Sequence, residues 1–261
     1  MPKVHVNDIE LDYEDYGKGN TLLLLHGLGS TKKDWDAQVP FFSKKYRVIT
    51  VDLRGHGNST KPLNDYGVGL MTEDIKQFLD QLNIKKATIV GFSMGGAVAF
   101  QMAASHPEYI DNIVIVNSGP DFNDMGQTGV DLLKNRIEFL ETKGLESLAH
   151  EISFNMFPEE HQIDLRNEFE TRCKNNDYNA YYKSFVTLMA WGLGDAIKDI
   201  TARTLVVSSD MDYTSVTFKE NYVNKLSNAR LVVIKNSRHG VVLDQPDAFN
   251  TALQNFLEDE E

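Results

Sequence analysis

The feature that most constrains the fold of this chain is a series of short, nearly continuous apolar runs that alternate with helical patterns. Runs of this kind are typical of strands buried on both faces of a parallel sheet, because helices cover both sides. An alternating pair before them, at 4–6 and 9–13, predicts an opening hairpin. The series therefore predicts an α/β fold built on a doubly wound sheet. The apolar runs are 21–25, 46–51, 87–90, 113–116, 205–207 and 231–234, and the helical patterns are 72–82, 97–104, 217–226 and 246–257.

One interval, 120–200, interrupts this alternation, because it contains helical patterns but no strand-like run. We expect it to form a helical cap, inserted after the sixth strand, over the carboxyl edge of the sheet. Residues 1–119 and 201–261 would then form the core domain. The cap is rich in aromatic residues, which either pack its helices together or line an apolar pocket. The four cap patterns are 130–142, 145–154, 159–174 and 179–193.

A candidate nucleophile stands in the turn after the run 87–90. The pentapeptide Gly-Phe-Ser-Met-Gly at 91–95 joins a predicted strand to a predicted helix, so the chain must reverse within a few residues. Its two glycines lack the Cβ atoms that would collide in so sharp a turn. The turn lifts Ser93 Oγ out of the sheet and leaves the Met94 N–H free at a helix N-terminus. This pattern is the G-x-S-x-G nucleophile elbow, although a Gly/Ser loop without chemistry also matches it.

A serine nucleophile needs a base, and the base needs a group that orients it. Among seven histidines, His239 follows the last predicted strand, in a loop at the sheet edge where Ser93 is expected. The chain order Ser…Asp/Glu…His requires a carboxylate between these two residues. Asp210 and Asp212 both follow the run 205–207, just past a strand end. On position alone, either carboxylate can orient His239.

Taken together, these segments resemble the α/β-hydrolase superfamily, in particular its small esterases, 3-oxoadipate enol-lactonases, cofactor-free haloperoxidases and C–C bond hydrolases. Besides the elbow, three segments match in the family's order: HGLG at 26–29, DLRGHGNS at 52–59 and HGVVLDQP at 239–246. The resemblance covers nearly the full length outside the cap. It implies the α/β-hydrolase fold, a mostly parallel eight-stranded sheet flanked by helices, with an inserted helical cap. Arg54 and His56 would then have an architectural role.

The resemblance also separates the two carboxylates. The family's acid usually follows three residues after a glycine that closes its strand. Ser209 holds the place of that glycine here, so the acid maps to Asp212, with Asp210 as the alternative. Some relatives carry the acid one strand earlier, but Asn117-Ser118 stand at that position and supply no carboxylate. This difference favours Asp212.

The segment 26–29 matches the family's oxyanion loop. The resemblance implies that the N–H groups of Leu28 and Met94 hold the developing oxyanion, while Gly27 lets the backbone approach the substrate. We therefore expect Gly27, Leu28 and Met94 to bind substrate, together with Trp191 from the cap. His26 would brace the loop and would not transfer protons.

The predicted function is a serine hydrolase that cleaves a small-molecule ester or lactone through an acyl-enzyme, with no metal and no organic cofactor. A C–C bond hydrolase or a perhydrolase- or haloperoxidase-like enzyme on the same triad is an alternative, although Gly240 stands where many C–C hydrolases carry tryptophan. A hydrolase-like ligand receptor with slow turnover is an alternative of another class. Three cap arginines, Arg136, Arg166 and Arg172, are either solvated or available to a substrate carboxylate.

Length and charge limit the remaining possibilities. A chain of 261 residues suits one large domain, or a core domain with an insertion. The balance of 26 basic to 38 acidic residues gives a net charge of −12, which argues against nucleic acid and anionic membranes as partners. No apolar stretch is long enough for a signal peptide or a membrane span, so we expect a cytoplasmic protein. The single cysteine, Cys173, forms no internal disulfide, and the sequence does not predict an oligomeric state.

Overall fold

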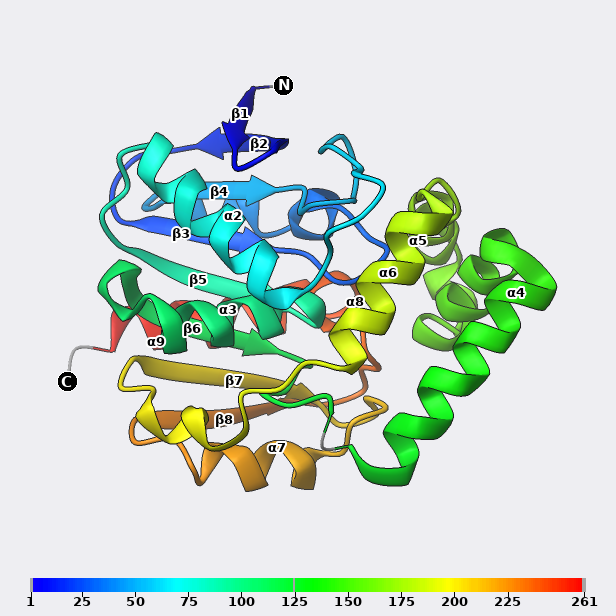
Figure 1. The fold of residues 1–261 in the computed structure, drawn as a ribbon. Helices are drawn as coiled ribbons and strands as arrows, with labels where there is room; N and C mark the ends of the chain where they lie inside the picture. The colour runs from blue at the N-terminus through cyan, green and yellow to red at the C-terminus, as the bar shows by residue number, and fades with distance from the viewer. Residues whose placement is uncertain (1, 124, 260–261) are drawn as a thin grey trace.

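The computed structural model describes residues 2–123 and 125–259 (Figure 1). In this part of the chain, eight strands form one sheet in the order β1-β2-β4-β3-β5-β6-β7-β8. β2 pairs antiparallel with β1 and β4, and every later pair is parallel. The expected α/β-hydrolase architecture is confirmed. The strands are β1 (Lys3–Val6), β2 (Ile9–Tyr16), β3 (Thr21–Leu25), β4 (Arg47–Val51), β5 (Ala87–Phe92), β6 (Ile110–Val116), β7 (Arg203–Ser209) and β8 (Ala229–Ile234).

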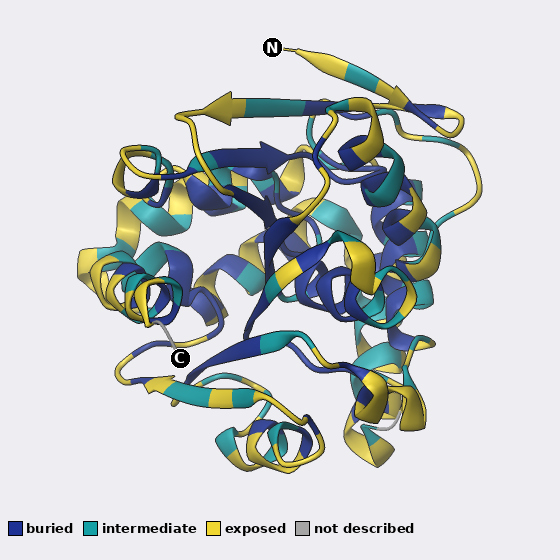
Figure 2. Ribbon diagram, turned by 90° about the vertical axis from the view of Figure 1, so that its left-hand side faces the viewer, coloured by how far each residue is buried: buried dark blue, intermediate teal, exposed yellow. Residues whose placement is uncertain are grey.

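Helices cover both faces of the sheet, which explains why its strands are continuous apolar runs. In β3, for example, Leu23 and Leu25 join one buried cluster, while Leu22 and Leu24 join another on the opposite face. The first cluster includes side chains of α2 (Val68–Gln81), α3 (Met94–Ser105) and α7 (Val216–Val223). The second includes side chains of α1 (Val39–Phe42), α8 (Val241–Asp244) and α9 (Pro246–Glu258). Figure 2 shows the middle strands as buried, whereas the edge strand β1 is largely exposed.

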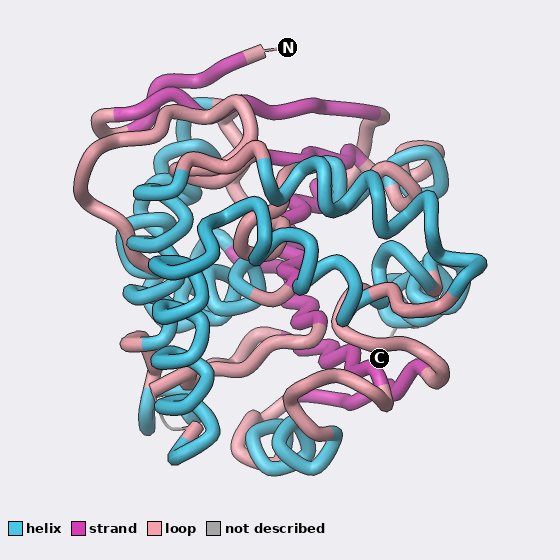
Figure 3. The backbone as a smooth tube through the Cα atoms, turned by 90° about the vertical axis from the view of Figure 1, so that its right-hand side faces the viewer, coloured by secondary structure: helices cyan, strands magenta, loops and turns pink. Residues whose placement is uncertain are grey.

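The helical insertion lies between β6 and β7, beyond the carboxyl ends of the parallel strands (Figures 1 and 3). It contains α4 (Gly126–Met156), α5 (Ile163–Lys174) and α6 (Tyr178–Met189). α4 is broken at Gly144, whose φ of 79° and ψ of 173° are not helical, so the two helical patterns expected here lie on either side of this residue. Short 3₁₀ turns complete the chain: η1 (Lys32–Trp35), η2 (Pro107–Tyr109), η3 (Glu160–Gln162) and η4 (Gly194–Asp199).

The two ends of the insertion are tied to each other by a short backbone pairing, which we call the neck. Asp121 and Gly192 form an antiparallel bridge. Beside it, the Phe122 N–H donates to the Trp191 carbonyl at 3.0 Å, and the Leu193 N–H donates to the Pro120 carbonyl at 2.9 Å. The cap helices therefore connect to the sheet through a pair of hydrogen-bonded segments.

The stretch that follows the neck packs with the sheet domain. Ile197 of η4 and Ile200 are buried in the same cluster as α2 and α3. The end of the expected cap at residue 200 thus includes a turn that contacts the core. No helix in the described residues is both long and apolar enough to cross a lipid bilayer.

Candidate active site

The turn between β5 and α3 presents Ser93 at the carboxyl edge of the sheet. Its φ of 51° and ψ of −113° lie outside the helical and extended regions, so the backbone is strained where the strand ends and the helix begins. Packing requires both glycines of the turn. A Cβ on Gly91 would lie 2.2 Å from the carbonyl oxygen of Gly95, and a Cβ on Gly95 would lie 2.3 Å from that of Leu25. The chain therefore makes the sharp turn that the pentapeptide predicts.

The structure brings His239, in the loop after β8, against Asp212, in the loop after β7. His239 Nδ1 lies 2.7 Å from Asp212 Oδ1, and the Asp212 carboxylate is fully buried. Asp210 is exposed instead, and its Oδ1 accepts a hydrogen bond from the Ser237 N–H at 3.3 Å. Of the two candidate carboxylates, Asp212 is the one that contacts the imidazole.

A buried lysine lies on the other side of Asp212. Lys219 of α7 has a fully buried side chain, and its Nζ donates to Asp212 Oδ2 at 2.5 Å and to Thr214 Oγ1 at 2.7 Å. Burial raises the pKa of the Asp212 carboxyl, but His239 and Lys219 outweigh this effect and lower that pKa to about 2. The carboxylate is thus ionised at neutral pH, with one oxygen facing the imidazole and the other facing an ammonium group.

Two aromatic rings cover the faces of the His239 imidazole. Tyr213 stacks on it with ring centroids 4.1 Å apart and 27° between the planes, and Phe92 lies at 5.0 Å and 44°. These rings and the hydrogen bond to Asp212 restrict the imidazole to one orientation. Sequence patterns do not single out Tyr213 or Lys219; the one available signal is that Tyr213 directly follows Asp212.

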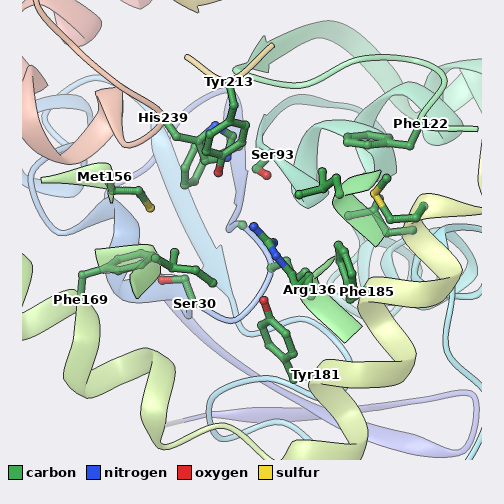
Figure 4. Close-up of a pocket in the computed structure, with 17 residues that line it drawn as sticks. Ser30, Ser93, Phe122, Arg136, Met156, Phe169, Tyr181, Phe185, Tyr213 and His239 are labelled. Atoms are coloured by element: carbon green, nitrogen blue, oxygen red, sulfur yellow. The ribbon is translucent and has the colours of Figure 1, made fainter. Parts of the chain in front are cut away.

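Ser93 and His239 line the same cavity between the sheet edge and the cap (Figure 4). Among the described residues no hydrogen bond joins Ser93 Oγ to His239. Such bonds commonly tighten only when substrate binds. The cavity measures about 620 Å³, counting its opening to solvent, and a second cavity of about 400 Å³ also has both residues in its wall. Two neighbouring cavities therefore meet at Ser93 and His239.

The cap supplies most of the wall of the larger cavity, which is largely apolar. The lining residues are Leu132, Arg136, Ile152 and Met156 from α4, Phe169 from α5, Tyr181, Phe185, Leu188 and Met189 from α6, and Gly27, Leu28, Ser30, Phe92, Ser93, Phe122, Tyr213 and His239 from other segments.

The described residues contain no group of three or more His, Cys, Asp or Glu side chains placed to hold a metal ion.

Of the residues expected to bind substrate, Gly27 and Leu28 are among the described residues that line this cavity, but Trp191 and Met94 are not. Trp191 belongs to the neck, and its Nε1 donates to Gln101 Oε1 at 2.8 Å. Its ring packs against that of Phe122, with centroids 6.4 Å apart. Because Phe122 does line the cavity, Trp191 stands behind the wall and does not form it. The Met94 side chain is buried in the core, so this residue can face the cavity only through its backbone.

The glycine-rich loop after β3 passes beside the elbow. The Gly95 N–H donates to the His26 carbonyl at 3.1 Å, and His26 Nε2 accepts from the Leu53 N–H at 3.0 Å. Burial lowers the pKa of His26, which therefore serves as a neutral brace. In the described part of the chain, neither the Leu28 N–H nor the Met94 N–H has a hydrogen-bond partner. Both donors remain open to an oxygen atom at the elbow.

The turn after β4 makes structural contacts. The Arg54 side chain is fully buried, and its guanidinium donates to Asp74 Oδ2 at 2.7 Å and to Asp8 Oδ1 at 2.9 Å. His56 is also buried, and its Nδ1 donates to the Arg54 carbonyl at 2.9 Å. Burial lowers the pKa of His56 to about 3. Within the described residues, neither side chain lines the cavities beside Ser93.

Comparisons with known proteins identify the family of this chain. Residues 20–246 match the family model of the α/β hydrolase fold. The enol-lactonase of Burkholderia xenovorans LB400 is 25% identical in sequence, with a TM-score of 0.92 over 99% of this chain and 100% of that one. An esterase from Exiguobacterium antarcticum is 25% identical, with a TM-score of 0.91 over 98% and 99% of the two chains. A bromoperoxidase from Bacillus anthracis is 25% identical, with a TM-score of 0.87 over 96% of each. The chain therefore belongs to the α/β hydrolase fold family.

Proposed function

We propose that this α/β hydrolase is a serine hydrolase that cleaves a carboxylic ester or a lactone through an acyl-enzyme intermediate. The observation that carries the proposal is the 2.7 Å contact of His239 Nδ1 with the buried Asp212 carboxylate, beside a cavity that Ser93 also lines. An oriented imidazole near a hydroxyl on an elbow is the arrangement that general-base activation of serine requires. Similarity to an enol-lactonase and an esterase supports the substrate class.

In the proposed reaction, Ser93 gives its proton to His239 Nε2 and attacks the acyl carbon. The oxyanion of the tetrahedral intermediate accepts hydrogen bonds from the Leu28 and Met94 N–H groups, each worth about 10²–10³ in rate. His239 then returns the proton to the leaving alcohol, and a water molecule repeats the sequence to release the acid. Asp212 keeps the other imidazole proton on Nδ1, so that Nε2 is free to act as the base.

The test is hydrolysis of 4-nitrophenyl acetate and butyrate under conditions that require many turnovers. We expect sustained release of nitrophenolate, and a loss of at least about 10³-fold in kcat for Ser93→Ala. Ser105→Ala, at the exposed end of the same helix, is the matched control and should retain wild-type activity. Mass spectrometry of the wild-type protein early in the reaction should detect one acyl group on Ser93. A single turnover, or full activity of Ser93→Ala, would rule the proposal out and favour a ligand receptor.

A further inference from the structure

Arg136 is a cation in the wall of the cavity beside Ser93, and it faces no acidic side chain there. Its guanidinium carbon lies 5.0 Å from the centroid of the Phe185 ring. None of the described residues that line this cavity is Asp or Glu. Glu151 lines a neighbouring cavity that Arg136 also borders, but among the described residues no carboxylate forms an ion pair with Arg136. Arg172 of the same cap, in contrast, pairs with Asp34 at 3.4 Å. The Arg136 guanidinium is therefore able to bind an anionic ligand that enters this cavity.

A second polar group in the same wall also lacks a partner. The Tyr181 side chain of α6 is only 3% exposed, and among the described residues its hydroxyl has no well-aligned hydrogen-bond partner. Leaving a buried hydroxyl unpaired costs about 1–3 kcal/mol, unless a ligand completes its hydrogen bonding. Burial raises the pKa of Tyr181, and Arg136 opposes that shift through its positive charge and through a side-chain interaction, which indicates that the two groups lie close together. Figure 4 shows both side chains directed into the cavity below Ser93.

We propose that Arg136 and Tyr181 form a subsite for a free carboxylate in the acyl part of the substrate. A guanidinium binds a carboxylate through two parallel N–H···O bonds, and a phenol donates a further charge-assisted hydrogen bond. The surrounding wall of Phe185, Leu188 and Met189 suits the methylene chain between the carboxylate and the ester. The inference deepens the proposed hydrolase function, because it makes the preferred substrate an anionic ester or lactone that yields a dicarboxylic acid.

The test compares two esters that differ only in this charge, mono-4-nitrophenyl adipate and its methyl-capped form, methyl 4-nitrophenyl adipate. Adipate is long enough that its carboxylate does not attack its own ester, as shorter half-esters do. We expect wild-type kcat/KM to be higher for the free carboxylate. Arg136→Met should lower kcat/KM for the free carboxylate by about 10- to 100-fold and change that for the capped ester by less than about threefold. Tyr181→Phe should give a smaller loss with the same selectivity.

Lys134→Met is the matched control, because Lys134 is an exposed cation of the same helix and does not line the cavity. It should leave both esters unaffected, whereas Arg136→Lys should retain part of the preference, since it keeps the charge but loses the planar fork. Equal losses on both esters in Arg136→Met, or a wild-type preference for the capped ester, would overturn the subsite.

Binding to the Ser93→Ala protein separates this inference from the proposed function. Adipate itself should bind to Ser93→Ala in calorimetry, and the additional change Arg136→Met should weaken that binding by about 10-fold or more. If the wild type hydrolyses neither ester but adipate binding still depends on Arg136, the hydrolase function fails and the anion subsite stands. If the esters are hydrolysed but adipate binding and ester preference ignore Arg136, the subsite fails and the hydrolase function stands.

Discussion

The two oxygens of the Asp212 carboxylate have different partners, and together these partners hold the carboxylate in one orientation. Oδ1 faces His239 Nδ1, and Oδ2 faces Lys219 Nζ. The lysine fixes the carboxylate so that its other oxygen remains aimed at the imidazole. An amide at this position would present a donor to the lysine or to the imidazole, so one of the two contacts must be lost.

Asp212→Asn is therefore expected to lower kcat for 4-nitrophenyl butyrate by about 10³–10⁴-fold, because the imidazole is no longer held in the tautomer that leaves Nε2 free. Asp210→Asn makes the same chemical change two residues away, at an exposed carboxylate that accepts a hydrogen bond from the Ser237 N–H. It should stay within about threefold of the wild type. Steady-state kinetics, with thermal unfolding to verify folding, decide between the two. A dead Asp210→Asn beside an active Asp212→Asn would reverse the assignment.

Sequence order leads to Ser93 and His239, since each follows a recognisable strand, and the family resemblance favours Asp212 over Asp210. The structure brings His239 against Asp212 and places Ser93 in the wall of the same cavity as His239. Lys219 and Tyr213 are not predictable in this way. Lysine side chains are solvated in most proteins, so only the fold reveals that this one is buried against Asp212. Trp191 was expected in the cavity because it is a large aromatic residue of the cap. In the structure its indole N–H donates a hydrogen bond to Gln101, and its ring lies behind the cavity wall.

At the scale of elements, the neck decides how the cap is held over the sheet. Its two segments approach so closely that a Cβ on Gly192 would lie 2.0 Å from Asp121 Oδ1. Asp121 also accepts a hydrogen bond through Oδ2 from the Gly194 N–H at 3.2 Å. A side chain at position 192 must push this carboxylate away and weaken the pairing on both sides of it.

We expect Gly192→Ala to loosen the cap more than it destabilises the sheet. Proteases should cut the cap at lower concentration than in the wild type, and KM for 4-nitrophenyl butyrate should rise severalfold, since most of the cavity wall is cap. Limited proteolysis mapped by mass spectrometry, together with kinetics, provides the measurement. Gly69→Ala is the control: a Cβ there meets nothing within 4 Å, and alanine favours the helix by about 1 kcal/mol. Equal protease sensitivity in the two variants would contradict the role given to the neck.

Apolar periodicity predicts the strands to within a few residues, because strands buried on both faces leave an unbroken apolar signal. It predicts the cap less completely. The paired patterns around Gly144 are one helix broken by a non-helical residue, and the turn at η4 has no pattern of its own. The neck cannot be predicted from apolar periodicity, since it is a backbone pairing between segments about seventy residues apart in the sequence.

At the scale of the whole molecule, folding buries two neutral histidines, His26 in the loop after β3 and His56 in the turn after β4. The rings of His26 and His56 lie 5.1 Å apart, and both side chains are fully buried. Burial lowers the pKa of each, in His56 to about 3, whereas an unfolded histidine titrates near 6.5. Between these values the unfolded chain binds more protons than the folded one. Stability from these residues is therefore present above about pH 6.5 and is lost as the pH falls.

For His56 alone, this linkage predicts a loss of about 2 kcal/mol in the free energy of unfolding between pH 7 and pH 5. His56→Gln cannot titrate, and its amide N–H can still reach the Arg54 carbonyl. It should be less stable than the wild type at pH 7 but lose about 2 kcal/mol less on going to pH 5. Urea unfolding of both proteins at the two pH values measures the difference. An identical loss in the two proteins would mean that His56 is not responsible for the acid sensitivity.

The neck also has a consequence for how such a chain changes over generations. The insertion leaves and rejoins the sheet domain through one hydrogen-bonded pair of segments, so the residues between them can be exchanged or lengthened while the strands keep their register. Most of the cavity wall lies within that insertion, whereas Ser93, Asp212 and His239 lie outside it. One contiguous stretch of the gene can thus be rewritten for a new substrate without touching the codons of the three proposed catalytic residues.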